Sequence, residues 1–153
     1  MVNFQREGVL SNSKVGFSFE NLALQVLSSR GLTLQRSFSL EIGVSAVKKR
    51  HSFDFGSKEN KLVVECKSHK WTTGRNIPSA KLTTWDQAMY YFSLVPKEYR
   101  KIFFILKDTC DNRRESLASY YMRTHRHLIP SGVEFWEHSE SANSTEILSC
   151  EFK

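Results

Sequence analysis

Cysteine and proline are both scarce in this sequence, which has three of each among its 153 residues. Cys66, Cys110 and Cys150 are odd in number and widely spaced, with no C-x-x-C pair. Disulfide frameworks and zinc or iron–sulfur sites need closer sets of cysteines, so the sequence indicates none of them. This cysteine usage fits a reducing compartment, and we expect a cytoplasmic protein.

Long apolar runs are also missing. The first residues, Met1–Glu7, contain no apolar segment of the kind found in signal peptides. No stretch approaches the roughly 20 apolar residues that a membrane-spanning helix needs. We therefore expect no membrane partner.

The residues that are present are typical of a globular protein. Hydrophobic residues make up 40% of the chain and aromatic residues 12%, enough for one domain with a sizeable core. We expect a single domain over residues 1–153, with residues 1–14 as a flexible arm. Lysine and arginine number 22 against 16 acidic residues, so the net charge is +6 and the pI about 9.3. This basic excess is compatible with a polyanionic partner.

A β-hairpin is predicted between residues 52 and 67. Ser52–Phe55 and Leu62–Val64 are rich in aromatic and β-branched residues, and the residues between them are turn-like. A four-residue turn over Ser57–Asn60 would place Asp54 opposite Val63.

This register brings the charged residues together. Side chains alternate along a strand, so Asp54, Glu65 and Lys67 would share one face with Val63. The other face would belong to the core and would hold Phe53, Phe55, Leu62 and Val64. A shift by one residue would mix charges with aromatic side chains, so the hydrophobic pattern favours this register.

Two carboxylates and a lysine on one face have a chemical use. Carboxylate oxygens are ligands of Mg²⁺ and Mn²⁺, and such a cation can hold phosphate oxygens and lower the pKa of a bound water. The backbone carbonyl of Cys66 could add a ligand, and Lys67 would offset charge that develops in the transition state. A surface hairpin with an ion pair between Glu65 and Lys67 explains the same residues without any chemistry.

A first amphipathic helix is predicted ahead of the hairpin. Its apolar stripe starts after Gly16, with Ser18 as a plausible N-cap, and Gly31 is a suitable C-terminal cap. Glu20 lies in the first turn, where it either complements the helix dipole or contributes to the site.

A second helix is predicted to begin at Pro78 and Ser79. Its buried stripe is formed by Leu82, Trp85, Met89 and Phe92. Gln87 and Tyr91 are four residues apart, so they share a different face of the same helix.

Further strands and one more helix follow from the hydrophobic pattern. Residues 32–44 alternate as a strand that is broken near Gln35 and Arg36, and residues 101–107 form an apolar run typical of a strand buried on both sides. Residues 111–128 predict a third helix that starts at Asp111 or Asn112. Short strands are expected at 133–137 and 146–152.

Basic residues gather in two predicted loops near the hairpin. They are Lys48, Lys49 and Arg50 in the loop 43–50, and Lys70 and Arg75, with Trp71, in the loop 68–77. Cations attract phosphates and an exposed tryptophan stacks on bases, so both loops are candidate nucleic-acid contacts. The alternatives are solvated basic loops and a Trp71 that covers the core.

Four separate motifs, in this order, resemble those of the PD-(D/E)xK nuclease superfamily, which includes restriction endonucleases, Holliday-junction resolvases and RecB-type exonucleases. The motifs are Gly16–Glu20 for the first-helix acid, Asp54 for the acid of the second strand, Glu65–Lys67 for E-x-K, and Gln87–Tyr91 for the Q-x-x-x-Y of the RecB-type branch. The resemblance spans residues 16–106. It departs from the family in having Phe53 where a proline often precedes the acid, and in lacking an iron–sulfur cysteine set and a helicase portion.

The resemblance implies an α/β restriction-endonuclease-like fold, with a mixed central sheet flanked by helices in the order α-β-β-β-α-β-α-β. It implies an endonuclease or other DNA hydrolase that uses Mg²⁺ or Mn²⁺, working alone, as a homodimer, or as a subunit of a larger DNA-processing assembly. The implied site has metal ligands at Asp54, Glu65 and the Cys66 carbonyl, with Glu20 in support. Lys67 would assist the attacking water, and Gln87 and Tyr91 would place the substrate or the lysine.

Two other functions fit the same sequence. One is a nucleic-acid-binding module of this fold that is inactive or depends on a partner for activity. The other is a structural or partner-binding α/β domain whose acids form surface ion pairs. DNA binding without cleavage would indicate the first, and an absence of metal-dependent stabilisation and salt-dependent DNA affinity would indicate the second.

Overall fold

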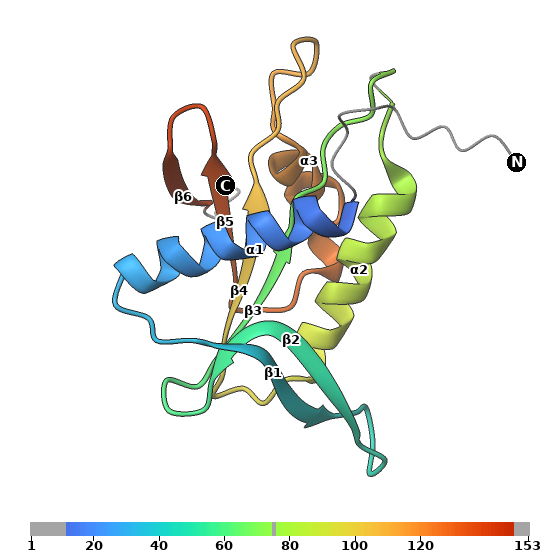
Figure 1. Cartoon of the computed structure of the whole chain (residues 1–153). Coiled ribbons are helices and arrows are strands. Elements are labelled where there is room, and N and C mark those ends of the chain that lie inside the picture. The colour runs from blue at the N-terminus through green and yellow to red at the C-terminus, as the bar shows by residue number, and fades with distance from the viewer. Residues whose placement is uncertain (1–11, 75, 149–153) are drawn as a thin grey trace, which may run out of the picture.

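A six-stranded mixed sheet with helices on both faces forms the part of the chain that the structure describes (Figure 1). The structure is a computed structural model, and it describes residues 12–74 and 76–148. The strands are β1 Gln35–Ile42, β2 Lys49–Ser57, β3 Leu62–Lys67, β4 Arg100–Leu106, β5 Val133–Ser139 and β6 Ser144–Leu148. The helices are α1 Asn12–Ser29, α2 Ser79–Leu94, α3 Leu117–Thr124 and a 3₁₀ turn at Arg126–Leu128. The predicted α/β class, mixed sheet and element order are confirmed, and β6 lies where the second short C-terminal strand was expected.

The strands lie in the sheet in chain order. The central strands β3, β4 and β5 are parallel, and the remaining neighbours are antiparallel. Every residue from Lys101 to Leu106 of β4 is buried, which confirms the predicted strand that is covered on both faces. The sheet is therefore closed from solvent in the middle and open toward its two antiparallel ends.

Two hydrophobic cores lie on opposite faces of the sheet. On one face, Phe19, Ala23 and Leu27 of α1 pack with residues of β2 to β5. On the other face, the predicted α2 stripe is buried together with residues of α3, and Trp85 and Tyr121 are the largest fully buried side chains in this core. Figure 1 shows α1 crossing one face of the sheet, with α2 and α3 on the other. The site described below lies between these two layers.

The hydrophobic residues of the hairpin do not share one face, so that prediction is wrong. Phe53 belongs to the core under α2, whereas Phe55 belongs to the core under α1. Val63, which was expected beside the charged residues, is fully buried under α2. The alternation along β2 is therefore interrupted between Phe53 and Phe55, at Asp54.

The interruption has its counterpart in β1, at Ser37. Arg36 pairs with Phe55 and Phe38 pairs with Phe53, and Ser37 between them has a φ of 51°. Arg36 stacks on Phe55 on one face, while Phe38 packs on the other. Residues two apart in a regular strand share a face, so the left-handed Ser37 is where the β1–β2 hairpin switches faces. The strand break expected at Gln35 and Arg36 lies at this residue instead.

Ser37→Gly is expected to raise the free energy of unfolding by about 0.5–1 kcal/mol, because a left-handed conformation strains a side chain and not a glycine. Ser39→Gly in the same strand is the matched control and is expected to lower it by a similar amount. Urea denaturation of the three proteins measures both changes. Equal losses in the two variants would contradict a strained Ser37.

Three other predicted boundaries differ from the structure. Helix α1 starts at Asn12, so residues 12–14 of the expected arm are helical, while residues 1–11 lie outside the described ranges. The expected N-cap at Ser18 is therefore wrong, and Glu20 lies in the middle of the helix and not in its first turn. The loop after β1 ends at Lys48, and Lys49 and Arg50 already belong to β2. Strand β6 begins at Ser144, and the remainder of the expected strand, 149–152, is outside the described ranges. The cap at Gly31 is confirmed by its φ of 83°.

Helix α3 is shorter than predicted. It starts at Leu117, where the Ser116 hydroxyl accepts a hydrogen bond from the Ser119 N–H at 3.1 Å. Arg114 has a φ of 52°, and a left-handed residue cannot continue a right-handed helix, so the expected start at Asp111 or Asn112 is wrong.

No helix in residues 12–74 and 76–148 is both long and apolar enough to span a membrane.

Candidate active site

The β2–β3 hairpin differs in register from the prediction by two residues. Gly56 pairs with Val63 and Phe55 with Val64, so the turn covers Lys58–Lys61 and not Ser57–Asn60. Lys61 has a φ of 46°, which completes this later turn. A shift by two keeps each strand's alternation, so Asp54 still comes next to the E-x-K segment, now closer to Glu65 than predicted.

Asp54 stands where the two strands separate. The last recorded pair of the ladder is Phe55 with Val64, and beyond it the Asp54 Oδ2 accepts a hydrogen bond from the Cys66 N–H at 2.7 Å. The carboxylate thus replaces the backbone partner that β2 would offer. Burial raises the pKa of Asp54, while the Cys66 N–H, Lys67 and His51 act to lower it. Asp54 is therefore a half-buried acid that is held in one position.

Glu65 and Lys67 lie on the α2 side of β3. The Lys67 Nζ is 3.6 Å from the Glu65 Oε1, and only about a fifth of each side chain is exposed (20% and 19%). Burial and the nearby Asp54 carboxylate raise the pKa of Glu65 to about 8, against the pull of Lys67. The raised pKa means that Glu65 holds its proton tightly, and a cation bound beside Asp54 and Glu65 would lower this pKa again because it offsets the repulsion between the two carboxylates.

Glu20 reaches the same group of charges from α1. Burial and Asp54 raise the pKa of Glu20, and Arg36 opposes both effects. The Arg36 Nη1 is 4.0 Å from the Glu20 Oε2, and another nitrogen of Arg36 donates to the Asn21 side chain. Arg36 was not predicted as a site residue, because a single arginine in an alternating strand gives no signal of what it faces.

Tyr91 reaches the site through His51. The Tyr91 ring stacks on the His51 imidazole with 3.7 Å between ring centroids and 17° between planes, and His51 interacts with Asp54. Burial lowers the pKa of His51 more than Asp54 raises it. Gln87 is exposed one turn earlier on α2. Tyr91 therefore lies at the edge of the site. Gln87 makes no hydrogen bond to Asp54 or Glu65.

The predicted basic contacts that the structure describes lie on two parts of the molecule. Lys48, Lys49 and Arg50 are exposed at the end of the β1–β2 hairpin, where the Lys48 Nζ donates to the Gly43 carbonyl. Lys70 is exposed just after β3. Arg75 lies outside the described residues.

The prediction that Trp71 stacks on bases is wrong. Its side chain is 7% exposed and packs edge-on against Tyr120 at 5.2 Å between centroids. The backbone N–H of Trp71 donates a hydrogen bond to the Asp108 carboxylate at 2.8 Å, which connects this loop to the segment after β4. The alternative, that Trp71 covers the core, is confirmed.

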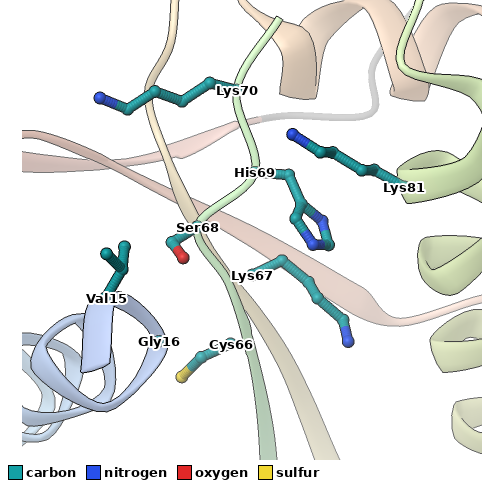
Figure 2. Close-up of a pocket in the computed structure, with 8 residues that line it drawn as sticks. All are labelled: Val15, Gly16, Cys66, Lys67, Ser68, His69, Lys70 and Lys81. Carbon is teal, nitrogen blue, oxygen red and sulfur yellow. The ribbon is translucent and has the colours of Figure 1, made fainter. Parts of the chain in front are cut away.

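A cavity of about 580 Å³ opens beside these residues, between α1 and α2 and beyond the end of β3. Its lining consists of Val15, Gly16, Cys66, Lys67, Ser68, His69, Lys70 and Lys81. Figure 2 shows Cys66 and Ser68 directed toward α1, and Lys67 and His69 directed toward α2. Lys67 therefore borders the carboxylates on one side and the cavity on the other, whereas Asp54 and Glu65 do not line the cavity.

The donors at this site fit a magnesium-type cation. In residues 12–74 and 76–148, no group of three or more histidine, cysteine, aspartate or glutamate side chains is placed to hold a metal ion. Mg²⁺, however, is commonly bound by one or two carboxylates, with waters and substrate phosphates as the other ligands. Asp54 and Glu65 supply two carboxylates. The Cys66 carbonyl points to the same side of β3 as its N–H, which faces Asp54.

Comparisons with protein-family models, with curated proteins and with solved structures found no match to this chain.

Proposed function

We propose that this protein is a metal-dependent deoxyribonuclease with a restriction-endonuclease-like fold. The observation that carries the proposal is the position of Asp54, which binds the Cys66 N–H at the opening of the β2–β3 ladder, next to the Glu65–Lys67 pair. Two acids and a lysine thus meet at a gap in the sheet. A surface hairpin with one ion pair gives no reason for Asp54 to be buried there.

The residues divide the chemistry of phosphodiester hydrolysis among them. Asp54, Glu65 and the Cys66 carbonyl would hold Mg²⁺ or Mn²⁺, which when bound polarises the phosphate and lowers the pKa of water. Lys67 provides a fixed positive charge next to these ligands, where it stabilises negative charge on the phosphate and orients the attacking water. Glu20, held by Arg36, adds negative charge on the α1 side.

Mg²⁺ is expected to raise the melting temperature of the wild type but not of Asp54→Asn. A cation at a hundred times its dissociation constant stabilises the folded state by about 2.7 kcal/mol, which is roughly 5–10 °C for a chain of this size. Asparagine can still accept the Cys66 N–H, so this variant removes the charge and keeps the local structure. Differential scanning fluorimetry with and without MgCl₂ measures the shift. An equal shift in both proteins would contradict metal binding at Asp54.

A second candidate function is a nucleic-acid-binding module of the same fold without cleavage. The observation in its favour is that fewer than three acidic, histidine or cysteine side chains are grouped as metal ligands in the described residues. DNA binding that depends on salt, together with no cleavage of duplex, single-stranded or four-way-junction DNA in Mg²⁺ or Mn²⁺, would support this candidate. Cleavage of any of these substrates, lost in Asp54→Asn, would support the nuclease.

A further inference from the structure

The cavity beyond Lys67 is lined by positive charge. Three lysines, Lys67, Lys70 and Lys81, contribute to its lining, and no carboxylate does. Lys67 has Glu65 as its partner, but no described residue provides a carboxylate within ion-pair distance of Lys70 or Lys81. A concave surface with several cations and no acid is complementary to an anion.

The imidazole of His69 adds a hydrogen-bond donor, because its contact with Trp85 fixes which ring nitrogen carries the proton. The Trp85 indole N–H, which can only donate, lies 2.9 Å from the His69 Nδ1, so this nitrogen accepts. In the neutral ring the proton is then on Nε2, on the other side of the imidazole. Burial, with Lys67 and Lys81 nearby, lowers the pKa of His69 to about 4, so the ring stays neutral near pH 7. Figure 2 shows this ring between the side chains of Lys67 and Lys81.

The α1 side of the cavity is lined by Val15 and Gly16. A Cβ added at Gly16 would meet no atom of the described residues within 4 Å. Glycine inside a helix costs about 1 kcal/mol relative to alanine, and the protein gains no packing from it here. Its lack of a side chain leaves space on the α1 side of the cavity, beside Cys66 and Ser68.

We propose that this cavity binds a second phosphate group of the nucleic-acid substrate, next to the phosphate that is cut. Lys67 and Lys81, on either side of the His69 ring, supply the charge, and the His69 Nε2–H supplies a directed hydrogen bond. Lys70 adds a positive charge on the other side of the chain. The inference rests on the proposed function, because Lys67 connects the two places: it lines the cavity and pairs with Glu65. The subsite would fix the strand so that the scissile phosphate lies at the carboxylates.

The subsite is tested by DNA binding without metal. Fluorescence anisotropy in EDTA, with a 20-nucleotide DNA as single strand and as duplex, compares the wild type with Lys81→Met and His69→Leu. We expect each variant to bind about tenfold more weakly, as for the loss of one contact to a charged group. His69→Gln should stay within about threefold of the wild type, because an amide can accept from Trp85 and still donate to the phosphate.

Lys97→Met is the matched control. It removes the same charge from an exposed lysine beyond the other end of α2, and the helix between Lys81 and Leu94 alone is about 20 Å long. Binding by Lys97→Met should equal that of the wild type. Wild-type affinity in both Lys81→Met and His69→Leu, or an equal loss in Lys97→Met, would overturn the subsite.

Two further measurements test the phosphate subsite separately from the proposed nuclease activity. Oligonucleotides with a 5′-phosphate or a 5′-hydroxyl distinguish a strand end from an internal phosphate: a loss seen only with the 5′-phosphate identifies the end, and an equal loss identifies the internal group. DNA binding that depends on Lys81 in a protein that never cuts DNA would keep the subsite and reject the nuclease. Cleavage with an unchanged KM in Lys81→Met would keep the nuclease and overturn the subsite.

Discussion

Lys67→Met is expected to lower the rate of metal-dependent DNA cleavage by about 10²–10³-fold, the usual cost of removing one fixed charge that stabilises a transition state. The Lys67 Nζ is held 3.6 Å from Glu65, and we do not expect another lysine of the cavity to take over this position. Methionine keeps most of the length of the side chain and removes its charged ammonium group. Single-turnover cleavage at saturating protein measures the chemical step.

The control for this variant is Lys61→Met, which removes an exposed lysine from the β2–β3 turn of the same hairpin. Its cleavage rate should match the wild type. A Lys67→Met protein that cuts DNA within about threefold of the wild-type rate would show that Lys67 has no part in the chemistry.

Glu65→Gln is expected to make the metal-free protein more stable at pH 8. The pKa of Glu65 is raised in the folded state, so the folded protein holds this proton more tightly than the unfolded chain does. The stabilisation is complete below pH 4.5 and is lost as the pH rises toward 8. A shift from 4.5 to about 8 corresponds to about 4 kcal/mol by pH 8, and glutamine escapes this loss because it carries no charge.

Thermal unfolding in EDTA across pH 5–8 measures this difference. The melting temperatures of Glu65→Gln and the wild type should nearly coincide near pH 5 and separate by roughly 8–16 °C near pH 8. Glu59→Gln, in the exposed turn, should follow the wild type at every pH. A Glu65→Gln protein that is less stable than the wild type at pH 8 would mean that the Glu65–Lys67 ion pair stabilises the fold, as the surface-hairpin interpretation holds.

The element order and much of the core could be predicted because they depend on local periodicity. The α2 stripe and the apolar run of β4 are fully buried as expected. The α2 stripe recurs at intervals of three and four residues, and the β4 run from Ile102 to Leu106 contains no polar residue. The same alternation predicted Asp54 beside Glu65 and Lys67. The turn was predicted one residue too early, because the sequence does not indicate that Lys61 adopts a left-handed conformation.

The departures from the prediction come from residues whose conformation is set by distant parts of the chain. Ser37 switches the faces of the β1–β2 hairpin, and nothing in its neighbours indicates a left-handed backbone. The polar neighbours of Trp71 suggest an exposed side chain, yet Tyr120, far along the chain, packs against it. Arg114 interrupts the third helix in the same way.

Several residues of the candidate site depend on contacts that no spacing encodes. Arg36 faces Glu20 across two elements, His51 lies under Tyr91, and His69 accepts from Trp85. Each partner is at least 16 residues away, so only the assembled sheet and helices bring the pairs together. These contacts give the site its fixed geometry, and the sequence motif alone predicts only the acids and the lysine.

The most direct test of the proposed function is a cleavage assay of the wild type and Asp54→Asn side by side. Supercoiled, linear duplex, single-stranded and four-way-junction DNA are incubated with each protein in MgCl₂, in MnCl₂ and in EDTA. The proposal predicts that the wild type cuts at least one substrate in Mg²⁺ or Mn²⁺ and not in EDTA, and that Asp54→Asn cuts none. Equal cutting by both proteins, or no cutting by the wild type on any substrate, would contradict it.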